Sequence, residues 1–427
     1  MPPTKTSRPT TIGWSRSGAE RRALMDADDF RFLLSPAGQA ALAELAGEPL
    51  TPDTHLALAA RLRVSLPPGA ANAVLETALL RRRAARKFSR AAEMYFTRDG
   101  LEQATAEPLA AHRARRFAAA GATTVADLGC GIGGDALALA AAGARVLAID
   151  REWLHTAMAG ANAAVYGVAD RLLPVRADLL ELPPLPAGAF FFDPARRTGG
   201  GPHDAPARRL RSVDAYQPPL SLIDAWRLRV PHGAVKVSPG IDYAELPPDA
   251  EVEFVSFEGE VREGVLWFGD LRDGARRRAT LLPAGDTLSD ADGPPEASAG
   301  PPRAYLYEPD GAVIRAHLVA QLAGRLEATL LDPAIAYLTA GAAQVTPFAR
   351  CFRIEDAFPF QLKRLRQELR RRDVGQATIK KRGSPLDPDD LRRALRLRGS
   401  THVILFLTQV MGQPTVIIAQ PWPDAVG

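Results

Sequence analysis

The spacing of apolar residues in the first quarter of the chain predicts helices. Across residues 25–95, apolar side chains recur three and four positions apart, as in "ANAVLETALL", and no strand pattern interrupts them. Each such helix has an apolar face that must pack against a neighbour. We therefore predict a small helical domain over residues 25–95, followed by one further helix at about residues 99–120.

From Thr123 to about Asp273, short apolar runs alternate with helical segments. Seven of these runs predict strands: "TVADLG", "ARVLAID", "LLPVRAD", "AFFFDP", "GAVKVSP", "EVEFVSFEG" and "GVLWFGD". This alternation predicts a parallel, doubly wound sheet, in which the last two strands form an antiparallel hairpin around a short "EVRE" turn. The predicted fold class is α/β, with a Rossmann-like seven-stranded domain over residues 96–275.

The last third of the chain begins with residues 276–303, whose Pro, Gly, Ala, Ser and Asp content predicts a linker. Residues 312–331 then have a helical pattern. The segment from residue 345 to 422 predicts a compact α+β unit, with helices at "FQLKRLRQELRRR" and "PDDLRRALRLR" and strands at "QATIKK", "HVILFLTQV" and "PTVIIAQ".

Composition narrows the class of protein. The chain has 427 residues, of which 46% are hydrophobic and 24% charged, as in soluble proteins with more than one domain. No apolar run approaches the ~20 residues that span a bilayer. Residues 1–24 are basic and polar, and predict a flexible tail without the apolar centre of a secretory signal. We expect a cytoplasmic protein with no membrane association and no obligate protein partner.

Cysteine and charge add two further points. Cys130 and Cys351 are too few for a disulfide framework or a cysteine metal site, and we expect no bound metal. Between Cys351 and Gly427 there are 14 Lys and Arg against eight Asp and Glu, whereas the remainder has 39 against 41. The positive charge is therefore concentrated in the last fifth of the chain.

A glycine-rich turn follows the first predicted strand in "VADLGCGIGGDALALAAAG". Its spacing fits both the dinucleotide fingerprint and the S-adenosylmethionine pattern, because both ligands need backbone without Cβ atoms. Gly129, Gly131 and Gly134 fit the dinucleotide fingerprint, whereas Gly129, Gly131 and Gly133 fit the S-adenosylmethionine pattern. Within the loop, Cys130 is predicted to fill space rather than act as a nucleophile.

Three aspartates at strand ends favour S-adenosylmethionine. Asp127 would repel a pyrophosphate but would suit an α-ammonium group, through a charge-assisted hydrogen bond. Asp150 ends the next strand, where a carboxylate can take both ribose hydroxyls. Asp178 ends the third strand and is placed for the adenine amino group. The alternatives are that these residues only form turns and caps, or that the ligand is NAD.

The fourth strand ends abruptly in "FFFDPARR". Asp193 would lie at its carboxyl end, beside the crevice where ligands of open α/β sheets bind. Pro194 stiffens the turn, so a carboxylate and rigid carbonyls could align an N–H-bearing acceptor with a methyl group. Arg196 and Arg197 could grip a phosphate, or be solvated loop residues. Lys236, in "AVKVSP", could face the same crevice and bind substrate, or be solvated.

The C-terminal unit is predicted to bind nucleic acid. In "FQLKRLRQELRRR", three leucines form the buried stripe and leave basic side chains on the outer faces. We expect Arg370, Arg371 and Lys381 to contact phosphates, with recognition by shape rather than by base stacking. The alternative is an ordinary solvated face.

Several of these segments together carry a family resemblance. They are "FTRDGLEQAT" (residues 96–105), the glycine loop with Asp150, "DPARR" (residues 193–197) and "AYLYEPDGAVIRA" (residues 304–316). On these residues the chain resembles class I S-adenosylmethionine-dependent methyltransferases of the bacterial group with a THUMP-like C-terminal domain, related to trimethylguanosine synthases. The resemblance covers most of the chain and implies a ferredoxin-like segment at residues 304–344 and a THUMP-like domain at residues 345–422.

The resemblance also implies function. S-adenosyl-L-methionine would be the cofactor, held by Asp127, Asp150, Asp178 and the loop glycines, and Asp193 would lead the catalytic motif. The partner would be RNA, chiefly tRNA. Ala195 and Arg196 stand where related amino-methyltransferases have a second proline and an aromatic ring, so no ring is available there to stack a flipped base. The alternatives are a small-molecule methyltransferase and a non-catalytic RNA-binding protein on the same scaffold.

Overall fold

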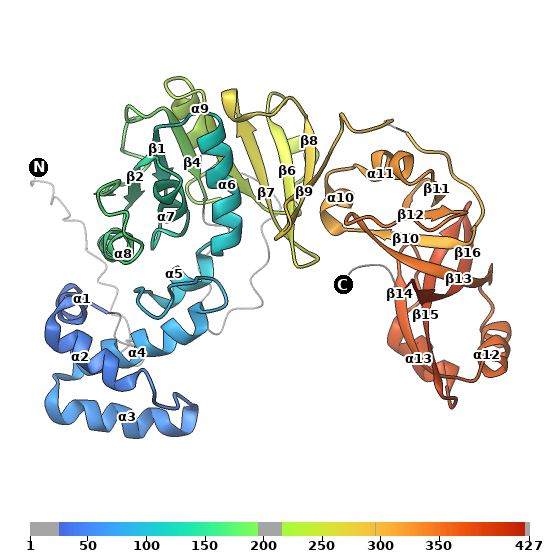
Figure 1. Ribbon diagram of the computed structural model, residues 1–427, viewed down its shortest axis with the longest axis horizontal. Helices are drawn as coiled ribbons and strands as arrows, with labels where there is room; N and C mark the ends of the chain where they lie inside the picture. Colours follow the sequence, from blue (N-terminus) through green and yellow to red (C-terminus); the bar gives the residue numbers. More distant parts are fainter. Residues whose placement is uncertain (1–24, 195–215, 295, 423–427) are drawn as a thin grey trace, which may run out of the picture.

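The structure is a computed structural model that describes residues 25–194, 216–294 and 296–422. Figure 1 shows a helical unit at one end, a large twisted sheet in the middle and a second sheet at the other end, in chain order. No helix in these ranges is long and apolar enough to cross a membrane. The predicted tail at residues 1–24 lies outside the described residues.

The helices predicted for residues 25–95 are present. Polar side chains begin three of them, because Asp26, Ser35 and Thr51 each accept N–H groups of the following first turn. The four helices are α1 (Ala27–Leu34), α2 (Pro36–Leu45), α3 (Pro52–Ser65) and α4 (Pro68–Ala84). The single helix predicted at residues 99–120 is wrong, because the chain breaks at Ala104–Ala106 into α5 (Arg98–Gln103) and α6 (Glu107–Ala119).

The central sheet has the strand order β3-β2-β1-β4-β5-β7-β6-β8-β9. Its first five strands are parallel, and β7 is antiparallel to both β5 and β6. The predicted seven strands are β1 (Thr124–Leu128), β2 (Arg145–Asp150), β3 (Leu172–Arg176), β4 (Ala189–Phe192), β5 (Gly233–Val237), β6 (Glu251–Phe257) and β7 (Glu260–Phe268). The predicted α/β Rossmann-like fold is confirmed.

Two details of this sheet differ from the prediction. "EVRE" is part of β7, and the hairpin turns at Glu258 and Gly259, which both have the positive φ of a tight two-residue loop. The linker predicted at residues 276–303 is wrong in its first half, because β8 (Arg277–Leu282) pairs with β6 and β9 (Asp286–Ser289) pairs with β8. Pro and Gly there mark the turn between strands rather than a loop.

The three phenylalanines of β4 are buried on both faces of the sheet. Phe191 packs into the core shared with α7 (Gly134–Ala141), α8 (Trp153–Val165) and the N-terminal helices. Phe190 and Phe192 face the opposite core, which includes α9 (Leu222–Arg227). Successive side chains of a strand point to opposite faces, so a strand covered on both sides is apolar throughout.

The second sheet has the order β11-β12-β10-β13-β16-β15-β14, and only β14 and β15 pair in parallel. It joins the two segments predicted separately, because β10 from residues 304–344 pairs with β13 from residues 345–422. The helical prediction for residues 312–331 is only partly right, since the chain forms two short helices and then a strand. Its elements are β10 (Tyr305–Pro309), α10 (Gly311–Arg315), α11 (Val319–Arg325), β11 (Thr329–Asp332), β12 (Ile335–Ala340), β13 (Ala349–Pro359), α12 (Leu362–Arg371), β14 (Val374–Lys381), α13 (Pro388–Leu395), β15 (Thr401–Val410) and β16 (Gln413–Pro421).

Candidate cofactor and active site

The glycine loop connects β1 to α7 and depends on backbone conformations that favour glycine. Gly129, Gly131 and Gly133 have φ values of +85°, +53° and +94°. A Cβ on Gly133 would also lie 3.2 Å from the Ala159 side chain in α8. The Gly129 and Cys130 N–H groups both donate to the Ile149 carbonyl at 2.9 Å, which ties the loop to β2.

Asp150, the last residue of β2, binds the loop through its side chain. Its carboxylate accepts the Gly131 N–H at 3.0 Å and the Glu152 N–H at 2.9 Å, and His155 Nδ1 lies 3.5 Å away. Burial raises the pKa of Asp150, but the His155 side chain and these backbone N–H groups outweigh it and leave the pKa below its ordinary value. Asp150 is therefore a fixed, ionised carboxylate beside the loop.

Asp127, in β1, is a buried carboxylate without a complete set of partners. It is 1% exposed, and its Oδ2 accepts no hydrogen bond from any described residue. Burial, together with the nearby carboxylates of Asp135 and Asp193, holds the pKa of Asp127 well above its ordinary value. A buried acceptor of this kind, next to a glycine loop, fits a ligand that carries an ammonium group, as S-adenosyl-L-methionine does.

Asp178 lies two residues beyond β3, at the same edge of the sheet. The chain reaches it through Ala177, whose N–H donates to the Asp150 carbonyl at 3.0 Å. The Asp178 side chain is exposed and accepts the Leu180 N–H at 2.9 Å. It therefore does form a local turn, as the alternative interpretation held, and its side chain is open to solvent.

The DPARR motif begins at the end of β4 with an ion pair. Lys236, from the neighbouring strand β5, donates to Asp193 Oδ2 at 2.6 Å and to Thr105 Oγ1 at 3.0 Å. Lys236 is buried, so the interpretation of this lysine as solvated is wrong. Pro194 is also buried. A Cβ on Gly129 would lie 3.7 Å from the Asp193 carbonyl, which puts the motif directly beside the loop. Arg196 and Arg197 lie outside the described residues.

Arg113 is a buried residue that holds the start of α7, directly after the glycine loop. This α6 residue is 1% exposed, and its Nε donates to Asp135 Oδ1, at the start of α7, at 3.0 Å. It also pairs with Glu263 of β7, and its guanidinium carbon lies 5.0 Å from the centre of the Phe191 ring. Burial alone would lower the pKa of Arg113, but the two carboxylates raise it above its ordinary value. The guanidinium thus cross-links α6, α7, β4 and β7.

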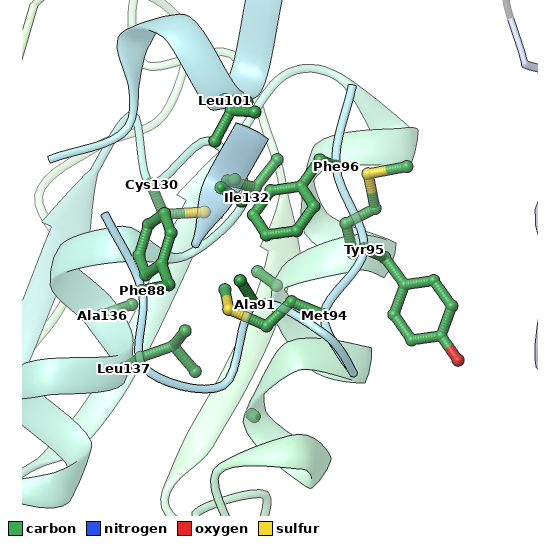
Figure 2. Close-up of a cluster of buried hydrophobic side chains, with 14 of the residues drawn as sticks. Phe88, Ala91, Met94, Tyr95, Phe96, Leu101, Cys130, Ile132, Ala136 and Leu137 are labelled. Atoms are coloured by element: carbon green, nitrogen blue, oxygen red, sulfur yellow. The ribbon is translucent and has the colours of Figure 1, made fainter. Parts of the chain in front are cut away.

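Cys130 is buried as predicted. Figure 2 shows it in an apolar cluster formed by the loop and the segment from Phe88 to Leu101. Burial, and the negative charges of Asp127 and Asp150, raise the pKa of its thiol well above the ordinary value. The thiolate needed for nucleophilic chemistry is therefore disfavoured, and the residue fills space.

The predicted basic residues of the C-terminal unit differ in their surroundings. Arg371 pairs with Glu368 at 2.8 Å, and Lys381 donates to the Leu386 carbonyl at 3.1 Å. Arg370 is exposed and forms no ion pair with a described residue. Seven basic side chains in the described part of this unit are exposed and free of ion pairs: Arg350, Lys363, Arg364, Arg370, Lys381, Arg396 and Arg398.

Sequence patterns missed three polar residues of this region, namely Thr105, Arg113 and His155. Thr105 and Arg113 come close to the loop only through tertiary contacts. His155 lies in the first turn of α8, where polar residues are common. A weak signal existed for Thr105, which ends the "LEQAT" stretch.

Comparison with known proteins agrees with this geometry. The model of the RNA cap guanine-N2 methyltransferase family matches residues 122–216, which include the glycine loop and β1 to β4. The model of the THUMP domain-like family matches residues 349–421. A domain family of unknown function matches residues 26–84, the helical unit.

Individual relatives extend the likeness to most of the chain. An uncharacterized S-adenosylmethionine-dependent methyltransferase of Mycobacterium tuberculosis is 39% identical over 348 residues, which cover 79% of this chain and 92% of that protein. A probable cobalt-precorrin-6B C(15)-methyltransferase of Pyrobaculum aerophilum is 38% identical over 87 residues, 19% of this chain and 42% of that protein.

A solved structure from Porphyromonas gingivalis, assigned as a methyltransferase, has the same fold. It superposes with a TM-score of 0.70 at 21% identity and covers 87% of this chain and 99% of its own. The strand order, the loop and the relatives agree on one family. The chain belongs to the S-adenosylmethionine-dependent methyltransferases, with a THUMP-like domain at its C-terminal end.

Proposed function

We propose that this methyltransferase transfers the methyl group of S-adenosyl-L-methionine to a nucleotide of structured RNA, such as tRNA. One observation carries the proposal: a methyltransferase region similar to an RNA-modifying family and a THUMP-like domain occur in the same chain. The uneven charge supports it, because clustered Lys and Arg are the electrostatic footprint of nucleic-acid binding.

We further propose how the cofactor is held. Asp127 binds the α-ammonium group, and the backbone of Gly129, Gly131 and Gly133 lies along the ligand. Asp150 takes the ribose hydroxyls. Its two backbone hydrogen bonds and His155 support this role, because they fix the carboxylate before the ligand arrives. Asp178 binds the adenine amino group, for which its exposed carboxylate is available.

For the transfer step, we propose Asp193 and Pro194 as the catalytic pair. When bound, the cofactor supplies an electrophilic methyl group on a positively charged sulfur. Asp193 accepts a hydrogen bond from the acceptor group, and the rigid turn at Pro194 directs a backbone carbonyl to the same group. Catalysis of this kind is chiefly positioning and electrostatics. We assign Arg196 and Arg197 to an RNA phosphate.

In the C-terminal unit, exposed basic side chains around α12 and α13 are the proposed RNA contacts. Arg370, Arg371 and Lys381 were predicted, and Lys363, Arg396 and Arg398 join them because they are exposed and unpaired among the described residues. No aromatic platform was predicted here, so recognition would follow RNA shape and phosphate positions.

The test is transfer of tritiated methyl groups from S-adenosyl-L-methionine to RNA, protein and metabolite extracts. We expect counts in RNA, abolished by Asp193→Asn. Asp150→Ala should weaken binding of S-adenosylhomocysteine, measured by isothermal titration, by about tenfold or more, since hydrogen bonds to a charged group contribute about 1.5–3 kcal/mol. Counts only in the metabolite fraction would instead establish a small-molecule methyltransferase.

A further inference from the structure

The buried lysine of the central sheet has an unusual position for a substrate-binding residue. The side chain of Lys236 is 8% exposed, whereas that of Asp193 is 20% exposed. A ligand at this edge of the sheet therefore reaches the carboxylate more easily than the ammonium group. Two of the three hydrogens that the ammonium group can donate go to Asp193 and Thr105.

The ion pair with Lys236 fixes the orientation of the Asp193 carboxylate. Lys236 engages Oδ2 at 2.6 Å, and Oδ1 accepts no hydrogen bond from the described residues. A carboxylate that could otherwise rotate about its last torsion is thereby held with one oxygen engaged and one available. The lysine cannot shift freely, because Thr105 Oγ1 holds it from the other side at 3.0 Å.

The segment that immediately precedes Thr105 is in turn held by the N-terminal part of the chain. Lys87, in the turn after α4, donates to the carbonyls of Leu101, Glu102 and Ala104 at 2.7, 3.1 and 2.9 Å. Figure 1 shows that α5 lies between the N-terminal helices and the central sheet. On its other side, the Thr105 backbone packs against the start of α7, where a Cβ on Gly134 would lie 3.4 Å from the Thr105 carbonyl oxygen.

We propose that Lys236 and Thr105 are positioning residues that orient the Asp193 carboxylate for methyl transfer, and that Lys87 fixes Thr105 for this purpose. The inference rests on the proposed function, in which Asp193 contacts the methyl acceptor. It assigns Lys236 a role through Asp193 instead of the direct substrate contact that its sequence context suggested. It also gives the N-terminal helical unit a part in catalysis.

The test is steady-state methyl transfer to total RNA from a strain that lacks the gene, with Lys236→Met, Thr105→Val and Thr105→Ser. We expect Lys236→Met to lower kcat by about 10²-fold, because a misplaced catalytic group costs about that much. KM for the RNA and affinity for S-adenosylhomocysteine should change less than about twofold, since neither ligand touches the lysine. Thr105→Val should lower kcat by about tenfold, and Thr105→Ser, which keeps the hydroxyl, should restore it.

Lys380→Met is the matched control. Lys380 is also a strand lysine in an ion pair, with Glu308, but it lies in the second sheet, away from Asp193. Its loss should leave kcat unchanged. A higher KM for RNA with unchanged kcat in Lys236→Met would overturn the proposal and show a direct substrate contact. Loss of S-adenosylhomocysteine binding in the same variant would overturn it in favour of a structural role.

A second measurement separates this inference from the proposed function. If the wild-type chain methylates no RNA, the proposed function fails, and the ion pair is then tested by unfolding. Asp193→Asn should recover part of the stability that Lys236→Met loses, because it removes the charge left buried without a partner. Strictly additive losses would show that the two side chains are not coupled, and the positioning role would fall as well.

Discussion

The protonation of the buried Asp127 carboxylate is sensitive to a positive charge bound beside it. Its pKa is raised by burial and by neighbouring carboxylates, so part of the free protein carries a proton on Asp127 at pH values where ordinary aspartates are ionised. An ammonium group favours the ionised form. On the proposed binding mode, binding therefore releases this proton whenever the free protein holds it.

This gives a pH prediction with a definite sign. The affinity for S-adenosylhomocysteine, measured by isothermal titration, should fall as the pH drops below the raised pKa of Asp127, by up to about tenfold per pH unit. Asp127→Asn should bind more weakly at neutral pH and lose this part of the pH dependence. His155 titrates in both proteins, so the difference between the two profiles reports Asp127. Parallel profiles would remove Asp127 from the ammonium site.

At the scale of single residues, sequence patterns could predict some site residues and not others. Asp127 and Asp150 were predictable, because parallel strands end at one edge and the glycine turn marks that edge. Lys236 was predicted near the same crevice, but its bonds to Asp193 and Thr105 were not, since these residues lie 43 and 131 positions from Lys236 in sequence. No local pattern encodes such pairs.

At the scale of elements, Arg113 joins two helices and two strands through one buried guanidinium. Arg113→Met would leave Asp135 and Glu263 buried without their partner, and breaking a buried pair from one side costs about 3–5 kcal/mol. We expect urea unfolding to show a loss of that size. Arg98→Met is the control, because Arg98 is 52% exposed and its pair with Glu76 should contribute less than about 1 kcal/mol. Equal losses in the two variants would contradict the cross-linking role.

The helix α12 allows a similar comparison for RNA. Arg370 is exposed and unpaired among the described residues, whereas Arg366 donates to the Ala394 carbonyl and so holds the end of α13. Arg370→Ala should weaken RNA binding uniformly across sequences and flatten the plot of log affinity against log salt by roughly one unit. Arg366→Ala should leave the slope unchanged. If neither variant alters the slope, this face is only solvated.

Elements were predicted best where their pattern was long and regular. Strands β1 to β7 of the central sheet and the amphipathic α12 follow from the apolar pattern of their residues. Strands β8 and β9 were both missed. Strand β9 has four residues inside a Pro- and Gly-rich stretch, and pairing with β8 rather than its own propensity makes it a strand. Helices α10 and α11 and strand β11 were predicted as one helix, because each element is too short for the apolar pattern to separate it from the next.

For the whole molecule, the arrangement of the parts bears on the size of the substrate. The glycine loop follows strand β1 of the central sheet, whereas the exposed basic side chains lie around α12 and α13, beside the second sheet at one end of the molecule in Figure 1. The two parts are not loosely tethered, because α10 and Tyr307 pack into the same apolar core as β4 and β6. A substrate that contacts both sites must be long, which favours structured RNA over a free nucleotide.

The most direct test of this account is nucleoside mass spectrometry of RNA from a strain that lacks the gene. We predict that one methylated nucleoside, in the tRNA fraction, disappears in this strain. The wild-type gene should restore it, and the Asp193→Asn variant should not. If the methylated nucleosides of every RNA fraction are unchanged, RNA is not the substrate and the account is contradicted.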